Sequence, residues 1–176
     1  VLQPFNSDNQ QMRSESELFI QSVLDALSAH IAILNKTGEI ILVNAAWRQF
    51  ALDNSFDHPM VGIGLNYLDI CDRAAQLGSP GAHQIATGIL DVIAERMQSF
   101  EKEYDCHSPT EKRWFIMRVS HFLLGNEVYV IISHQNVTEL KKTQIEVQES
   151  KERIQAVLDN IANAVFTVAS NGEIET

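Results

Sequence analysis

The chain has 176 residues, a formal net charge of −10, an apolar content of 45% and a charged content of 20%. This length suits one domain with additional segments, and the composition is that of an ordinary soluble globular protein. The acidic balance argues against a nucleic-acid partner, because phosphate binding needs clustered Lys and Arg. No apolar run reaches the roughly 18 residues of a membrane span.

The first quarter of the chain predicts a lead-in, a helix and a hairpin. Residues 1–11 are polar, so we expect a frayed lead-in. Apolar residues at helical spacing predict an N-terminal cap helix over 12–27. Residues 31–34 and 39–43 then predict two strands paired around a short turn that contains a glycine.

Three helices are predicted in the middle of the chain. Asn44 is suited to cap the first of them, which spans 45–52. That helix carries two aromatic residues on one face, Trp47 and Phe50. The second helix spans 67–76 and the third spans 83–97. The third has an amphipathic stripe made by Ile85, Ile89, Val92 and Ile93.

Three strands follow, over 99–107, 113–122 and 128–134, with turns at 108–110 and 125–126. The order is two strands, several helices and three strands. Strands that do not alternate with helices indicate an α+β fold, with a five-stranded antiparallel sheet and the helices packed on one face.

Alternation along the last two strands separates two faces of that sheet. The outer face of the sheet, opposite the helices, would carry four apolar residues: Trp114, Ile116, Tyr129 and Ile131. This face is too apolar to stay exposed to water. We expect the N-terminal helix to cover it, either from the same chain or from a second subunit of a dimer.

The last element is a long polar helix over 137–161 with a heptad spacing of apolar residues. Its apolar positions are Val137, Leu140, Val147, Ile154, Leu158 and Ile161, with Gln144 and Lys151 completing the seam. A parallel dimeric coiled coil explains this pattern best. The alternative is a single helix that folds back onto its own domain.

Residues 23–41 and 157–175 are two copies of one motif: Val, Leu, Asp, Gly, Glu and Ile recur in matching positions. Each copy predicts a helix end, a short apolar strand, a turn and a second strand. A repeat of this kind indicates a tandem array. We therefore expect one complete domain over 28–136, the connecting helix over 137–161, and the start of a second domain over 162–176.

Several short motifs in this order resemble a PAS domain. They are Val43-Asn44-Ala45-Ala46-Trp47, Tyr104-Asp105-Cys106-His107-Ser108-Pro109, Arg113-Trp114-Phe115, and the closing Asn136-Val137-Thr138-Glu139. Relatives commonly have Asp-Ile-Thr-Glu at the closing motif, so this chain departs from it at two positions. The resemblance covers about residues 20–140, and the repeat adds the start of a second copy.

The resemblance implies a cytoplasmic sensory and dimerisation module of a bacterial signalling protein. Such modules stand before an output domain of the same chain: a histidine kinase, as in two-component systems, or a diguanylate cyclase or phosphodiesterase, as in cyclic-di-GMP signalling. We therefore expect input and relay, with no catalytic residue in this segment. A homodimer through the N-terminal helix, the C-terminal coiled coil or both is expected. No nucleophile–base pairing or phosphate-binding loop contradicts this interpretation.

The sequence leaves the cofactor unknown and argues against three classes. Residues 65–71 lack the Asn-Cys-Arg-Phe-Leu-Gln motif of flavin-binding light sensors, so Cys71 is expected to be a small buried residue. Heme-binding relatives use a histidine on the long middle helix, where His83 stands at the first turn and is better explained as solvated. No two His or Cys residues have metal-ligand spacing on one element. A small organic ligand, or none, remains.

His134 is the strongest single candidate for a ligand contact. It stands two residues before Asn136, where flavin-binding relatives have a Gln that faces the cofactor. The candidate pocket consists of His134, Ile132, Val130, Phe115, Met117, Tyr67, Ile85, Ile89, Val92 and Ile93. Equally, His134 could be a core histidine bonded to a backbone carbonyl, and most of the others simply core. Two functions follow: a ligand sensor, or a ligand-free dimerisation spacer.

Overall fold

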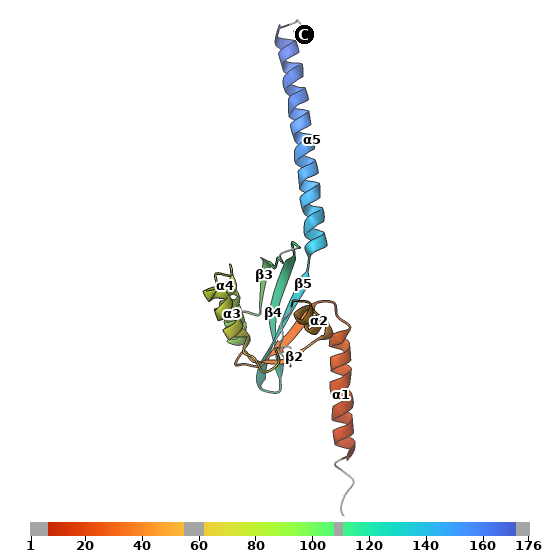
Figure 1. Cartoon of the computed structure of the whole chain (residues 1–176), viewed down its shortest axis with the longest axis vertical. Helices are drawn as coiled ribbons and strands as arrows, with labels where there is room; N and C mark the ends of the chain where they lie inside the picture. Colours follow the sequence, from red (N-terminus) through yellow and green to blue (C-terminus); the bar gives the residue numbers. More distant parts are fainter. Residues whose placement is uncertain (1–6, 55–61, 108–110, 172–176) are drawn as a thin grey trace, which may run out of the picture. The chain divides into compact units, whose positions relative to one another are not determined.

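A computed structural model describes residues 7–54, 62–107 and 111–171. The predicted turn at 108–110 and the last residues of the second repeat lie outside this described part. The chain divides into two compact units, Val1–Asn136 and Val137–Thr176. The elements (Figure 1) are α1 (Ser7–Asp25), β1 (His30–Leu34), β2 (Ile40–Val43), α2 (Ala45–Asp53), α3 (Tyr67–Gln76), α4 (Ala82–Ile93), β3 (Ser99–Asp105), β4 (Trp114–Leu124), β5 (Glu127–Asn136) and α5 (Thr138–Asn171).

The first unit contains one five-stranded antiparallel sheet with the strand order β2-β1-β5-β4-β3. The predicted α+β class and strand count are confirmed. β5, the last strand in the sequence, is central and pairs with both β1 and β4. This register places His134 opposite His30 on one side and opposite Met117 on the other.

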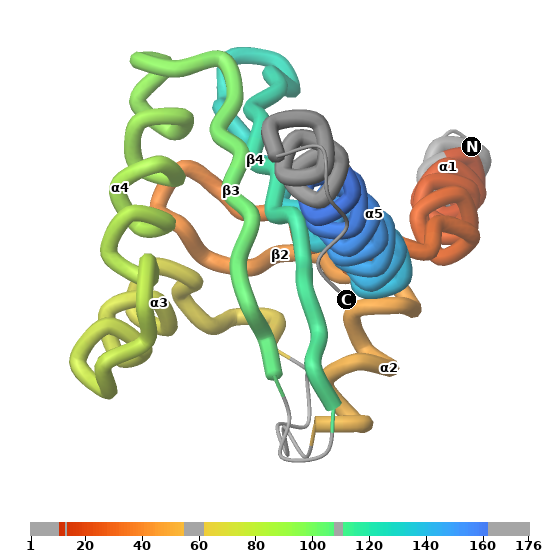
Figure 2. The backbone as a smooth tube through the Cα atoms, turned by 90° about the horizontal axis from the view of Figure 1, so that it is seen from above, coloured from red at the N-terminus to blue at the C-terminus, as the bar shows by residue number. Residues whose placement is uncertain are grey.

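The core lies on one face of this sheet. Along the middle of β4 and β5 the buried residues alternate as predicted: Phe115, Met117, Val119, Val130 and Ile132 are each at most 1% exposed. Ile89 and Val92 of α4 pack against them and are fully buried. α3 and α4 lie side by side along the sheet (Figure 2). Apolar burial between these layers supplies the main driving force for folding this unit.

Helix α4 ends at Ile93, four residues earlier than predicted. Glu95 has a positive φ of 55°, a left-handed conformation that an α-helix cannot continue through. The N–H groups of Arg96 and Met97 both donate to the carbonyl of Asp91, at 2.9 and 3.2 Å. These bonds close the helix C-terminus and turn the chain toward β3.

Helix α1 begins at Ser7, within the predicted lead-in, and ends at Asp25. Its apolar side chains Leu18, Phe19 and Val23 are 64%, 70% and 48% exposed. Helix α1 therefore does not cover the outer face of the sheet in its own chain, which was one of the two expected arrangements. Instead, the C-terminal end of α1 is held against α2, where Asp25 pairs with Arg48 at 2.9 Å.

The second unit is α5, a single helix from Thr138 to Asn171. The predicted helix over 137–161 is present, but the strand that the repeat predicts directly after it is not: residues 162–171 continue the helix. A lone strand has no partner for its backbone hydrogen bonds, whereas a helix satisfies them within itself. The coiled coil and the second domain remain predictions. None of the described helices is long and apolar enough to cross a membrane.

Asn44 is the best-connected polar residue of the first unit and is fully buried. Its side-chain oxygen accepts from the N–H groups of Ile31 and Trp47, at 2.9 and 3.0 Å. Its amide nitrogen donates to three carbonyls at 2.8–3.2 Å, those of Leu24, Leu27 and Ala29. One side chain thus caps α2 and also fixes the segment between α1 and β1.

We expect Asn44→Asp to lower the free energy of unfolding by about 2–4 kcal/mol. Asp is as good a helix cap as Asn, so the capping of α2 is kept. The loss of unfolding free energy then comes from the three donated hydrogen bonds, which are replaced by repulsive contacts between a carboxylate and carbonyl oxygens. Asn66→Asp is the matched control, because Asn66 caps α3 and donates only one bond, to Thr37. Urea unfolding measures both variants. Equal losses would contradict the connecting role of Asn44.

Candidate functional site

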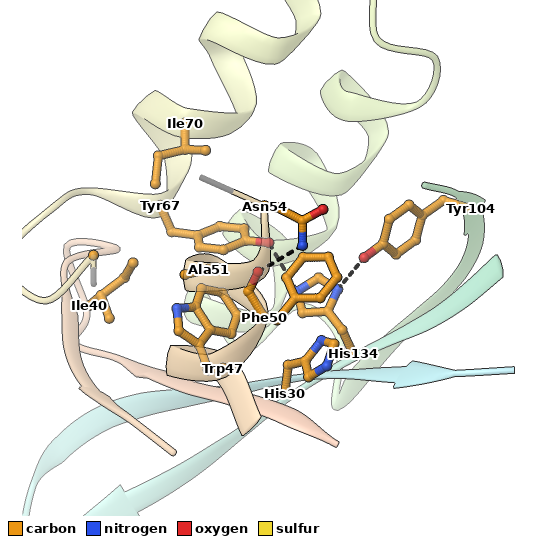
Figure 3. Close-up of a pocket in the computed structure, with 11 residues that line it drawn as sticks. His30, Ile40, Trp47, Phe50, Ala51, Asn54, Tyr67, Ile70, Tyr104 and His134 are labelled. Atoms are coloured by element: carbon orange, nitrogen blue, oxygen red, sulfur yellow. Dashed lines mark hydrogen bonds between the residues drawn. The ribbon is translucent and has the colours of Figure 1, made fainter. Parts of the chain in front are cut away.

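The first unit contains a cavity of about 290 Å³ with largely aromatic walls (Figure 3). It lies between α2, the start of α3 and the exposed end of the sheet's inner face. The lining residues are His30, Ile40, Trp47, Phe50, Ala51, Asn54, Gly62, Tyr67, Ile70, Tyr104 and His134. They come from six different elements and one turn, so only the folded chain brings them together.

Helix α2 supplies one wall. Trp47 and Phe50 are three residues apart and therefore lie on one face of the helix. Phe50 packs against His30, with ring centroids 4.6 Å apart, and Trp47 lies 5.7 Å from the ring of His134. The orientation of this wall depends on the N-terminus of α2, which Asn44 caps.

The opposite wall is a bridge of three hydrogen-bonded side chains. The hydroxyl of Tyr67 lies 3.1 Å from Nε2 of His134, and the hydroxyl of Tyr104 lies 2.7 Å from its Nδ1. Figure 3 shows both tyrosines pointing at the imidazole from opposite sides, Tyr67 from α3 and Tyr104 from β3. We call this cluster the Tyr–His–Tyr bridge. Both nitrogens of a buried imidazole are therefore partnered.

Burial keeps this bridge uncharged. Desolvation, followed by the nearby His30, lowers the pKa of His134 from 6.5 to about 3. Desolvation also raises the pKa of Tyr67 and of Tyr104 well above the usual value of 10. At neutral pH the imidazole is neutral and both phenols keep their protons. The bridge offers hydrogen bonds without charge.

A positive charge stands near Asn54, one of the lining residues. The guanidinium of Arg113 donates to the side-chain oxygen of Asn54 at 2.9 Å and lies 5.4 Å from the centroid of the Phe50 ring. Arg113 itself does not line the cavity. Burial, and then this charge, lowers the pKa of His30.

A second cavity, of about 440 Å³, shares Tyr67, Ile70, Tyr104 and His134 with the first. Its other lining includes polar and charged residues, among them Gln84, Lys102 and Glu103. The Tyr–His–Tyr bridge is therefore a wall common to an aromatic cavity and a more polar one.

The structure separates the ten predicted pocket residues into three groups. His134 and Tyr67 line the aromatic cavity, and Ile85 lines the second cavity. Phe115 lies behind the first cavity and contacts the rings of Phe50 and Tyr104. The remaining residues belong to the core or pack against it: Ile132, Val130, Met117, Ile89, Val92 and Ile93.

Sequence reasoning missed nine of the eleven described lining residues, including four that carry rings: His30, Trp47, Phe50 and Tyr104. The pairing of Trp47 with Phe50 on one helix face was visible, but nothing in the pattern indicated that this face meets the sheet beside His134. The alternative of a carbonyl-bonded His134 is wrong, since two phenol hydroxyls occupy its nitrogens.

Among the described residues, no three His, Cys, Asp or Glu side chains are arranged to hold a metal ion. Cys71 is buried, as predicted, and burial raises the pKa of its thiol to about 11. His83 is exposed on α4.

Comparison with known proteins supports a fold assignment. The sequence matches no family model. It is 38% identical over 122 residues to an uncharacterised 104.1 kDa protein of Rhodobacter capsulatus encoded in the hypE 3′ region. That match covers 68% of this chain but only 13% of the relative's length.

Among solved structures, the PAS domain of BvgS from Bordetella pertussis superposes with a TM-score of 0.52 at 18% identity, covering 79% of this chain and 98% of that domain. A PAS domain of an HTR-like protein from Haloarcula marismortui gives a TM-score of 0.47 at 11% identity, covering 74% and 99%. A PAS domain from a two-component sensor histidine kinase gives 0.45 at 12% identity, covering 70% and 98%.

The buried, neutral His134 predicts a specific pH dependence of stability. Between pH 6.5 and about 3 the unfolded chain binds a proton at this residue and the folded chain does not. Stability must therefore fall as the pH is lowered through this window, by at most about 1.4 kcal/mol per pH unit for one proton.

We expect His134→Gln to make the loss of unfolding free energy between pH 7 and pH 4.5 shallower, because glutamine does not titrate. His83→Gln removes an exposed histidine and should leave the slope unchanged. Urea unfolding at a series of pH values measures both. An unaltered slope in His134→Gln would show that the imidazole titrates normally in the folded chain.

Proposed function

We propose that this domain, which has the fold of PAS domains, is a sensory module that binds a small organic molecule in the aromatic cavity and relays the event through a dimeric helix α5. One observation carries the proposal. The central residue of the Tyr–His–Tyr bridge, His134, belongs to β5, which ends at Asn136 with only Val137 between it and α5.

The cavity has the features of a ligand site. Its volume of about 290 Å³ is at the lower end of the range for small-molecule pockets, about 300–1,000 Å³. Its walls are apolar and aromatic, with few polar groups that converge on one side. Such an arrangement lets shape and apolar contact provide affinity while the polar groups fix orientation.

The bridge offers a route for relay. A molecule that alters either tyrosine–histidine hydrogen bond must also change the forces on His134, near the end of a central strand. That strand runs into the helix with only Val137 between them. A small displacement there can bias two arrangements of a helix pair.

Helix α5 carries apolar side chains that its own unit leaves exposed. Val147, Ile154, Leu158 and Ile161 are 64%, 59%, 54% and 55% exposed. Their heptad spacing suits a partner helix. A second copy of α5 in a homodimer, through the seam that begins at Val137 and Leu140, accounts for both the spacing and the exposure.

The output lies elsewhere in a longer polypeptide. The chain spans about 13% of the length of the curated relative that it matches. We propose a histidine kinase or a cyclic-di-GMP enzyme as the output, in the cytoplasm, with no catalytic step in this domain. The PAS domain of a sensor histidine kinase named above has this kind of setting.

A ligand-free spacer is the second candidate, and one observation favours it. Both nitrogens of His134 already have partners within the chain. The polar side of the cavity is thus satisfied without a ligand. A domain of this kind would contribute only dimerisation and spacing between other modules.

Native mass spectrometry of the purified protein separates these two functions. We expect a dimer with additional mass on each subunit, and we expect His134→Ala to lose that mass while the domain stays folded. His83→Ala, an exposed histidine on α4, should retain it. A bare dimer in the unaltered protein would favour the spacer, and retention by His134→Ala would remove that residue from the site.

We expect Val147→Glu with Ile154→Glu to weaken the dimer at least about tenfold, because two buried carboxylates would face each other across the seam. Ala156→Glu with Asn160→Glu adds the same charge at outward positions of the helix and should leave the dimer intact. Sedimentation equilibrium measures both. A chain ending at Leu140 should be monomeric; dimers that persist there would locate the interface in α1.

A further inference from the structure

The Tyr–His–Tyr bridge contains one more hydrogen than it can use. A neutral imidazole contributes one N–H and the two phenols contribute two O–H groups, three hydrogens in all. The bridge has two hydrogen bonds, Tyr67 to Nε2 and Tyr104 to Nδ1. In either tautomer of His134, one phenol O–H is therefore left over.

The two distances indicate which tyrosine has the unused O–H hydrogen. The 2.7 Å separation between Tyr104 and Nδ1 suits an O–H donor, while the 3.1 Å separation between Tyr67 and Nε2 suits an N–H donor. Tyr104 then donates to Nδ1, and Nε2–H donates to the oxygen of Tyr67. The O–H of Tyr67 is the spare donor, and no other described residue accepts from it.

The cavity gives this donor an uncharged setting. Among the described lining residues there is no carboxylate, lysine or arginine side chain, and burial lowers the pKa values of both described lining histidines. An ionic ligand would lose its hydration without gaining a counter-ion from these residues. An uncharged ligand avoids that cost.

The shape of the cavity limits the ligand further. Its walls include the rings of Trp47, Phe50, Tyr67 and Tyr104, which favour stacked or edge contacts with another ring. A cavity of about 150 Å³ lined by apolar groups holds one benzene. The cavity in this chain, about 290 Å³, has room for two fused rings.

We infer that the ligand is an uncharged, flat, two-ring aromatic molecule that accepts one hydrogen bond from the hydroxyl of Tyr67. The inference rests on the proposed ligand-sensing function and narrows it to one chemical class. A ring nitrogen or a carbonyl oxygen is the accepting atom. Binding then uses the spare hydrogen, and the bond donated by the Tyr67 hydroxyl polarises the oxygen that accepts from His134, so that the strength of that hydrogen bond changes.

Four probes of nearly equal shape test this class. Isoquinoline, at pH 8, is uncharged and has a ring nitrogen that accepts a hydrogen bond. Naphthalene has the same shape without an acceptor. N-Methylisoquinolinium carries a fixed positive charge, and 2-naphthoate carries a negative one. Equilibrium dialysis against the full 176-residue chain gives the dissociation constant of each.

We expect isoquinoline to bind about three- to tenfold more tightly than naphthalene, the gain from one hydrogen bond, and at least about tenfold more tightly than either ion. Tyr67→Phe should abolish the preference for isoquinoline over naphthalene, and urea unfolding of the variant should show that the domain remains folded. Tyr129→Phe removes a phenol hydroxyl from β5 outside the cavity and should preserve the preference.

The outcomes distinguish this inference from the function on which it rests. If either ion bound as tightly as isoquinoline or more tightly, the inference of an uncharged ligand would be overturned, and the domain would be a sensor of an ionic molecule. Equal binding of isoquinoline and naphthalene, or a preference that survives Tyr67→Phe, would overturn the role of the hydroxyl. If none of the four binds, the aromatic class is wrong, while the sensor function is decided by the co-purified mass.

Discussion

The buried amide of Asn44 is the constraint on which the site depends. Through five hydrogen bonds it joins the end of α1, the start of β1 and the N-terminus of α2. A backbone group that stays buried after losing its partner costs about 1–3 kcal/mol. The position of α2 sets where Trp47 and Phe50 stand. Asn44, which does not line the cavity, thus holds the helix that supplies one of its aromatic walls.

The inner face of the sheet has two halves with different packing. Where α4 covers it, Ile89 and Val92 fill the space against Met117 and Val119 with no exposed area. Where α2 covers it, large rings meet at an angle, as between Phe50 and Phe115 at 72°, and leave a cavity. A polar residue is tolerated at that border because both nitrogens of His134 are bonded. Strand β5 therefore carries both closely packed core residues and the polar residue of the cavity.

That strand, β5, connects the site to the rest of the polypeptide. It pairs on both sides within the sheet, so its position is held by two ladders of backbone hydrogen bonds. The C-terminal end of this strand carries His134 and leads to α5. His134 is paired on both sides, so a change at this residue also acts on β1 and β4.

The amino-acid pattern by itself determined most of the secondary structure and the buried face of the sheet. Alternation assigned Phe115 and Met117 to the buried side, and the helix predicted over 67–76 has the observed bounds of α3, Tyr67–Gln76. Periodicity depends on which side of an element is apolar, so both could be read from neighbouring residues. Two of the three residues of the bridge, His134 and Tyr67, were also candidates, His134 because of its place before the closing motif that resembles PAS domains. Only the tertiary structure decided that Tyr104 completes that bridge and that Trp47, Phe50 and His30 face it. The physical reason is that these contacts join residues up to 104 positions apart, His30 to His134, and no local pattern records which elements meet across a sheet.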